Sequence, residues 1–211
     1  MKKSDIIFSV MILMFIIFLT VPVTHQAFFG FTDQHKIIGG FIKFFFFASI
    51  GDLLSQRITK GNYRVLGFFY KALVWGFIGI VIVLIFEIFS QGVLSLQNQN
   101  LLPFAGNIFF FALFTSIFMN VIFAPTMMLF HRITDAYIEG KINNGSYKLQ
   151  DTLVSLDMNK FIRFVIFKTI PLFWIPAHTI TFLLSETYRV LFASLLGVAL
   201  GLILGFAKRK S

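Results

Sequence analysis

The chain has 211 residues and a formal net charge of +9; 57% of its residues are hydrophobic and only 13% are charged. With a mean hydropathy of +0.85, it is more apolar than a soluble domain, in which about a quarter of the residues are charged. The chain has no cysteine, which excludes disulfides, thiolate metal sites and thiol catalysis. Cationic loops beside a membrane explain the positive charge better than nucleic-acid binding, so we expect the lipid bilayer as a partner and no nucleic acid.

Six apolar stretches fill most of the chain, and each is close to the roughly 20 residues that cross a bilayer as a helix. They cover residues 6–23, 37–56, 65–89, 107–130, 161–184 and 190–206. The connections between them leave too little chain for a separate soluble domain. The sequence therefore predicts an all-α fold, in which residues 1–211 form one integral membrane helical bundle with about six transmembrane helices.

Positive charges alternate between the connections. The two ends of the chain and the second and fourth connections are rich in lysine and arginine, whereas residues 90–106 carry no charge. The positive-inside rule then places both termini in the cytoplasm. Residues 1–23 have too long an apolar run for a signal peptide and are not arginine-rich, so we expect an uncleaved first helix. We expect a multi-pass protein of a bacterial plasma membrane, with an organelle inner membrane as the alternative.

Several polar side chains fall inside the predicted spans, where ionisable groups are costly and mark candidate functional sites. Asp52, Lys71 and Lys168 each lie about two helical turns from the cytoplasmic side, and Gln56 shares a helix face with Asp52. We interpret these four residues as a polar cluster that lines a wet path. The alternative is that Asp52 neutralises one lysine while the other lysines extend to the headgroups.

Helical spacing limits how the charges of the second and third helices can pair. Lys43 and Asp52 are nine residues apart, and Lys71 and Glu87 are sixteen apart, so each pair points to nearly opposite faces of its helix. The two helices therefore cannot form both a Lys43–Glu87 pair and an Asp52–Lys71 pair across one shared seam. At least one of these groups must turn to a third helix, to water or to the bilayer edge.

No catalytic or nucleotide-binding motif is present, and the four histidines form no ligand pair at helical spacing. Asp135 and Glu139 share a helix face near the cytoplasmic side, where we expect a solvated surface rather than a metal site. We therefore predict no enzyme, no metal and no cofactor.

The last predicted helix carries small residues four apart, at Ala193, Gly197, Gly201 and Gly205. Such a stripe lets another helix approach closely. We expect it to pack within the bundle; a homo-oligomer or a membrane partner is the alternative use.

Four short motifs, in order, resemble those of the Mpv-seventeen family, which includes the twenty-two-kilodalton peroxisomal membrane protein. They are G-D-L-L-S-Q at 51–56, W-G-F-I-G at 75–79, F-A-P at 123–125 followed by Gly140, and W-I-P-A at 174–177 followed by Tyr188 and Arg189. The resemblance covers residues 36–210, so residues 1–35 are an extra N-terminal helix and loop. Ile80 replaces a family proline and an isoleucine separates Trp174 from Pro176, which favours a distant, bacterial relative.

Members of this family look like small, poorly selective channels or metabolite pores. By position, the resemblance implies that the matching residues shape the polar interior; they are Gly51, Asp52, Gln56, Pro125, Trp174, Pro176 and Arg189.

From the residues and the resemblance together, we expect a channel or transporter-like protein for small solutes. Because lysines outnumber carboxylates in the inner cluster, we expect it to favour small anions. The alternative is a structural or assembly subunit that binds a membrane partner through the glycine stripe.

Overall fold

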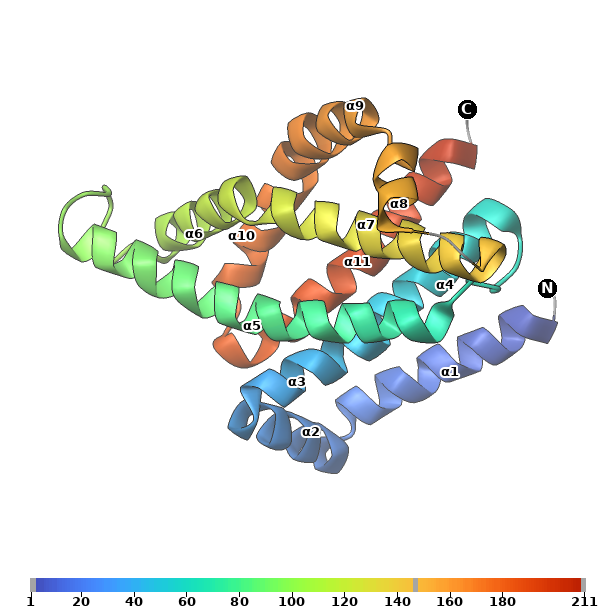
Figure 1. Ribbon diagram of the computed structural model, residues 1–211. Helices are drawn as coiled ribbons and strands as arrows, with labels where there is room; N and C mark the ends of the chain where they lie inside the picture. Colours follow the sequence, from blue (N-terminus) through green and yellow to red (C-terminus); the bar gives the residue numbers. More distant parts are fainter. Residues whose placement is uncertain (1–2, 146–147, 210–211) are drawn as a thin grey trace.

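The computed structural model describes residues 3–145 and 148–209, without the side-chain surroundings of residue 201 and residues 204–209. Every regular element in this part of the chain is a helix (Figure 1). In chain order they are α1 (Lys3–Thr20), α2 (Pro22–Gln34), α3 (Lys36–Lys43), the π-helix η1 (Phe44–Ala48), α4 (Ser49–Lys60), α5 (Phe68–Asn98), α6 (Ile108–Ile122), α7 (Ala124–Asn144), α8 (Leu149–Ser155), α9 (Met158–Lys160), the π-helix η2 (Phe161–Trp174), α10 (Ile175–Leu183) and α11 (Glu186–Arg209).

Four helical segments of this structure are long and apolar enough to cross a membrane. They are α1, the continuous run Lys36–Lys60, α5, and the run Met158–Leu183. The pair α6 and α7 adds a fifth segment if the two helices, bent by 47° at their junction, form one broken span. The predicted all-helical architecture with several membrane-type helices is therefore confirmed. The count of six and the orientation stay predictions.

Within two of the predicted spans, a proline lies at the start of a helix. Pro125 lies in the first turn of α7 and Pro176 in the first turn of α10. Proline lacks a backbone N–H and fits only the first turn of a helix without loss of a hydrogen bond. The break before Pro125 accounts for the bend between α6 and α7.

The long helices run side by side, and both ends of the described chain lie at the same end of the bundle (Figure 1). The start of α5 and the ends of α4 and α7 lie at this end as well. The α10–α11 connection and the α2–α3 corner lie at the other end. Residues 24–34, predicted as part of a connection, belong to helix α2.

Glycines set the closest helix crossings. A Cβ on Gly79 of α5 would overlap the carbonyl oxygen of Gly40 on α3, so the two backbones touch there. A Cβ on Gly51 of α4 would lie 3.1 Å from the backbone nitrogen of Val198 on α11. These contacts hold α3 against α5, and α4 against α11.

The small-residue stripe of α11 is thus used partly inside the chain. Ala193 is buried in the core, and a Cβ on Gly197 would meet no atom within 4 Å. Gly201 and Gly205 lie outside the residues whose side-chain surroundings are described. At Ala193 the expected packing within the bundle is observed, whereas the alternative use by a partner stays a prediction.

The core of the bundle is rich in aromatic rings. Phe44, Phe86 and Phe182 are each less than a tenth exposed, and the rings of Phe86 and Phe182 are 4.9 Å apart. Ile82 and Met119 complete the contact between α5, α6 and α10. This cluster joins η1, α5, α6, α10 and α11 in one core.

Candidate functional site

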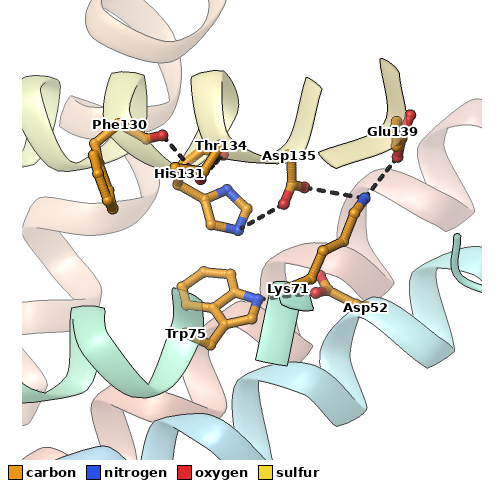
Figure 2. A network of polar contacts seen from close by, with 8 residues as sticks. All are labelled: Asp52, Lys71, Trp75, Phe130, His131, Thr134, Asp135 and Glu139. Atoms are coloured by element: carbon orange, nitrogen blue, oxygen red, sulfur yellow. Dashed lines mark hydrogen bonds and ion pairs between the residues drawn. The ribbon is translucent and has the colours of Figure 1, made fainter. Parts of the chain in front are cut away.

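Lys71 is the centre of the polar cluster at the end of the bundle that holds both termini. It lies in the first turn of α5, and its side chain is only 7% exposed. Its Nζ is 2.6 Å from Oε1 of Glu139 and 3.5 Å from Oδ2 of Asp135, both on α7 (Figure 2). Lys71 has therefore turned to a third helix, which is one of the outcomes that the spacing argument allowed.

One face of α7 supplies the partners. His131, Asp135 and Glu139 are spaced four residues apart, so they share this face. His131 Nε2 lies 3.9 Å from Oδ1 of Asp135. From the sequence we expected a solvated surface at Asp135 and Glu139, and their pairing with Lys71 was not predicted. The recurrence of three ionisable groups at a spacing of four residues was the signal that could have revealed this pairing.

Asp52 is held by a neutral donor rather than by a lysine. Its Oδ2 accepts a 2.9 Å hydrogen bond from the indole Nε1 of Trp75 (Figure 2). Trp75 is four residues after Lys71, so both side chains leave the same face of α5. No ion pair of Asp52 occurs among the described residues. The ring of His131 lies against Trp75, with centroids 4.1 Å apart.

Gln56 and Lys168 lie in different surroundings. Gln56 is close to the cluster, and its Nε2 donates to the backbone oxygen of Arg64 at 2.7 Å. Lys168 is exposed on η2, with its Nζ 5.9 Å from the centre of the Phe164 ring, and it lines none of the cavities described below. The structure thus brings together three of the four predicted residues and leaves Lys168 apart.

A cavity of about 400 Å³ opens at this cluster, and we call it the polar cavity. Its charged lining residues are three bases and three acids, namely Lys60, Arg64, Lys71, Asp52, Asp135 and Glu139. Ser55, Gln56 and Asn143 also line it. The opposite charges are therefore balanced, because α7 supplies two carboxylates that the sequence analysis had not placed in the cluster.

A second cavity of about 320 Å³, the apolar cavity, adjoins the polar cavity. Phenylalanine, methionine and aliphatic side chains line most of it, together with Trp75, Trp174, His131 and His178. Asp52 and Ser55 line both cavities. The hydrogen bond between Asp52 and Trp75 therefore lies at the boundary between them.

A buried hydrogen-bonded pair includes His178, which lines the apolar cavity. Asn120 Nδ2 lies 3.0 Å from Nδ1 of His178 and donates to the backbone oxygen of Ser116 at 2.8 Å. The ring of Trp174 stacks on His178 with centroids 5.3 Å apart. The indole Nε1 of Trp174 is buried and has no hydrogen-bond partner among the described residues, so it is a free donor beside this cavity.

The other residues matched to the family shape the backbone around the site. Gly51 allows α4 to approach α11, and Pro125 and Pro176 begin α7 and α10. Arg189 donates through Nε to the backbone oxygen of Leu184 at 3.0 Å, and through Nη2 to that of Phe182 at 3.2 Å. These bonds satisfy carbonyls at the end of α10 that have no partner within the helix.

Comparison with known proteins adds no relative to this description: no protein-family model matches the chain, and neither does any curated protein or solved structure. The resemblance to the Mpv-seventeen family therefore stays a prediction from the four motifs.

Proposed function

We propose that this protein is a six-span membrane protein with both termini in the cytoplasm, and that it conducts small solutes through the cluster around Asp52. The placement of the chain ends supports this orientation. The ends of α4 and α7, where Arg57, Lys60 and Lys141 lie, are at the same end of the bundle as both termini (Figure 1). One cationic end is the arrangement that the positive-inside rule associates with the cytoplasm.

The observation that carries the proposal is that Asp52 lines two cavities at once. The polar cavity offers charged and amide groups that can replace the hydration of a solute. The apolar cavity continues from it toward the middle of the bundle. We propose that together they form one path, with the contact between Asp52 and Trp75 as an inner constriction that a side-chain rotation opens.

The path is closed at its far end in this conformation. Phe44 lines the apolar cavity, and the packed rings of Phe86 and Phe182 lie beyond it. Apolar constrictions of this kind gate channels by excluding water. We propose that conduction requires these rings to separate.

The balanced charge of the polar cavity gives no support to the expected preference for anions. Three bases face three acids, and two of the acids are already paired with Lys71. We therefore propose small solutes of low net charge as the cargo.

The test is solute flux through the purified protein in liposomes, with wild type compared with Asp52→Asn. Asparagine keeps an oxygen that can accept from Trp75, so the fold is retained while the charge at the boundary is lost. We expect flux to change several-fold, on the order of the effect of one buried charge-assisted hydrogen bond. Asp157→Asn is the matched control, because Asp157 caps α9 through a bond to the backbone N–H of Lys160 and asparagine caps equally well.

Two results would contradict the proposal. One is flux no higher than in empty liposomes, with the wild-type protein folded and inserted. The other is an Asp52→Asn variant that conducts like both wild type and the Asp157→Asn control.

A further inference from the structure

A third cavity, of about 430 Å³, lies at the opposite end of the bundle, where α2, α3, α5 and α11 meet. We call it the outer cavity. Its charged lining residues are again three bases and three acids, namely Lys36, Lys43, Arg189, Asp33, Glu87 and Glu186. They are arranged by depth, which distinguishes this cavity from the polar cavity.

Lys43 forms the floor of the outer cavity. The residue is only 3% exposed, and its Nζ lies 5.4 Å and 5.8 Å from the ring centres of Phe29 and Phe28. Its ammonium forms neither an ion pair nor a hydrogen bond among the described residues. Contact with ring faces compensates a cation only in part, and a buried charge is costly unless it is paired. Asp33 attracts the ammonium from beyond ion-pair distance, so Lys43 lacks a counter-charge in direct contact, inside a cavity that can admit one.

The carboxylates lie at the rim. Asp33, Glu87 and Glu186 are all exposed. Asp33 accepts a hydrogen bond from Thr187 Oγ1 at 2.8 Å, and Glu87 accepts one from Gln91 Nε2 at 3.0 Å. These bonds hold Asp33 and Glu87 at the rim, where neither forms an ion pair with Lys43. The outer cavity thus has a positive floor and a negative rim.

Arg189 adds little free charge to the floor. Its Nε and Nη2 are engaged by the backbone of α10, and its guanidinium lies 5.7 Å from the centre of the Phe182 ring. Glu87 and Glu186 attract this guanidinium, so Arg189 partly offsets the rim carboxylates. The charge available to a ligand at the floor is therefore that of Lys43.

We propose that the outer cavity binds a small zwitterion, with its carboxylate on Lys43 and its cationic group between Glu87 and Glu186. A simple anion would reach Lys43 only past three carboxylates, and a simple cation would meet Lys43 at the floor. A molecule that carries both charges can interact favourably with the positive floor and with the negative rim. The volume is at the small end of the range of about 300–1,000 Å³ for ligand pockets, which fits a molecule of amino-acid size.

This site rests on the proposed function only for the step after binding, in which the ligand is transported. If the protein conducts solutes, the outer cavity is the entrance on the non-cytoplasmic side, and the zwitterion is the class of solute carried. Binding itself requires no conduction, so it can be measured separately.

The experiment is equilibrium dialysis of the protein in lipid nanodiscs against radiolabelled glycine betaine, a zwitterion with a permanent cation. We expect saturable binding, with acetate and tetramethylammonium competing about tenfold or more weakly, since each carries one of the two charges. Labelled glycine is the second probe, in case the trimethylammonium group is too bulky for the rim.

Variants assign the binding to the two levels of the cavity. Lys43→Met has similar length and no charge, and it should weaken binding by about tenfold or more, as the loss of a charge-assisted bond does. Glu87→Gln should weaken betaine but not acetate. Lys160→Met removes an exposed lysine on α9 and should bind like wild type. Thermal unfolding of each variant verifies that the bundle remains folded.

Each outcome decides the proposal. Acetate that binds as tightly as betaine overturns the zwitterion class, and failure of both betaine and glycine to bind overturns the site. Wild-type binding by Lys43→Met overturns the role of Lys43. Flux without zwitterion binding would leave the conducting path standing and remove this site, whereas binding without flux would do the reverse.

Discussion

At the scale of single residues, Lys71 and Asp52 of the polar cluster are stabilised in different ways. Lys71 has two carboxylate partners, whereas Asp52 has one neutral indole donor. The sequence predicted that Asp52 belongs to a polar cluster with Lys71 and Gln56, and these three residues line one cavity. The partners of Lys71 could not be derived, since the rotation of α7 depends on the bend that precedes Pro125.

Removal of the Lys71 charge should destabilise the bundle. In Lys71→Met, Asp135 and Glu139 lose their shared counter-charge one turn apart on α7. Loss of one partner from a fully buried pair costs about 3–5 kcal/mol, and these carboxylates are 28% and 52% exposed, so we expect about 1–2 kcal/mol after solvent screening. The measurement is unfolding in mild detergent.

A double variant separates this cause from lost packing. Lys71→Met combined with Glu139→Gln removes one of the two unpaired carboxylates and should recover part of the stability. Equal stability of wild type and Lys71→Met would show that the ion pairs contribute nothing.

At the scale of helices, glycine placement decides which elements touch. The sequence directed attention to the stripe 193–205 on α11, whereas the closest approach joins Gly79 of α5 to Gly40 of α3. A run of small residues shows that a helix can be approached but not which helix approaches it. Gly79 belongs to the W-G-F-I-G motif, so the motif contributes a crossing point rather than a polar group.

Gly79→Val tests this crossing. The added side chain would overlap the α3 backbone, which cannot move aside as a flexible side chain can. Overpacking of this kind typically costs about 1–3 kcal/mol, so we expect a clear fall in unfolding temperature or in the yield of folded protein. Gly92→Val is the control, because Gly92 is on the same helix and an added Cβ there meets no atom within 4 Å. Equal losses in the two variants would indicate an effect of helix propensity alone.

At the scale of the whole molecule, composition and charge sufficed to predict an all-helical, membrane-type bundle. The sequence could not give the helix α2 within the first connection, because this segment is only moderately apolar and has no charge pattern of a span. Nor could it give the three cavities, since each is lined by side chains from at least three separate elements.

Membrane topology has a direct test, because the chain has no native cysteine and a single introduced cysteine is the only one that a reagent can label. Asn62→Cys lies between α4 and α5, and Gln99→Cys lies at the far end of α5; both positions are exposed. A membrane-impermeant maleimide should label Gln99→Cys in intact cells, and Asn62→Cys only after permeabilisation. At about 1.5 Å per residue, the 31 residues of α5 reach about 46 Å, enough to separate the two positions by a bilayer.

Two outcomes of this labelling would correct the proposal. Labelling of both cysteines from the same side would show that α5 does not cross the membrane. The inverse pattern would place both termini outside the cytoplasm.

Because α7 follows a bend, a small rotation at the start of this helix moves its far end by a larger distance. Glu139 is sixteen residues beyond Phe123, which at about 1.5 Å per residue gives an arm of about 24 Å. A rotation of about 5° about Phe123 displaces the end of an arm of this length, and with it Glu139, by about 2 Å. Such a displacement is comparable to the 2.6 Å that separates Glu139 from Lys71. A rotation of a few degrees at the bend between α6 and α7 is therefore enough to separate Glu139 from Lys71 at the polar cavity. Pro125 determines the position of this bend.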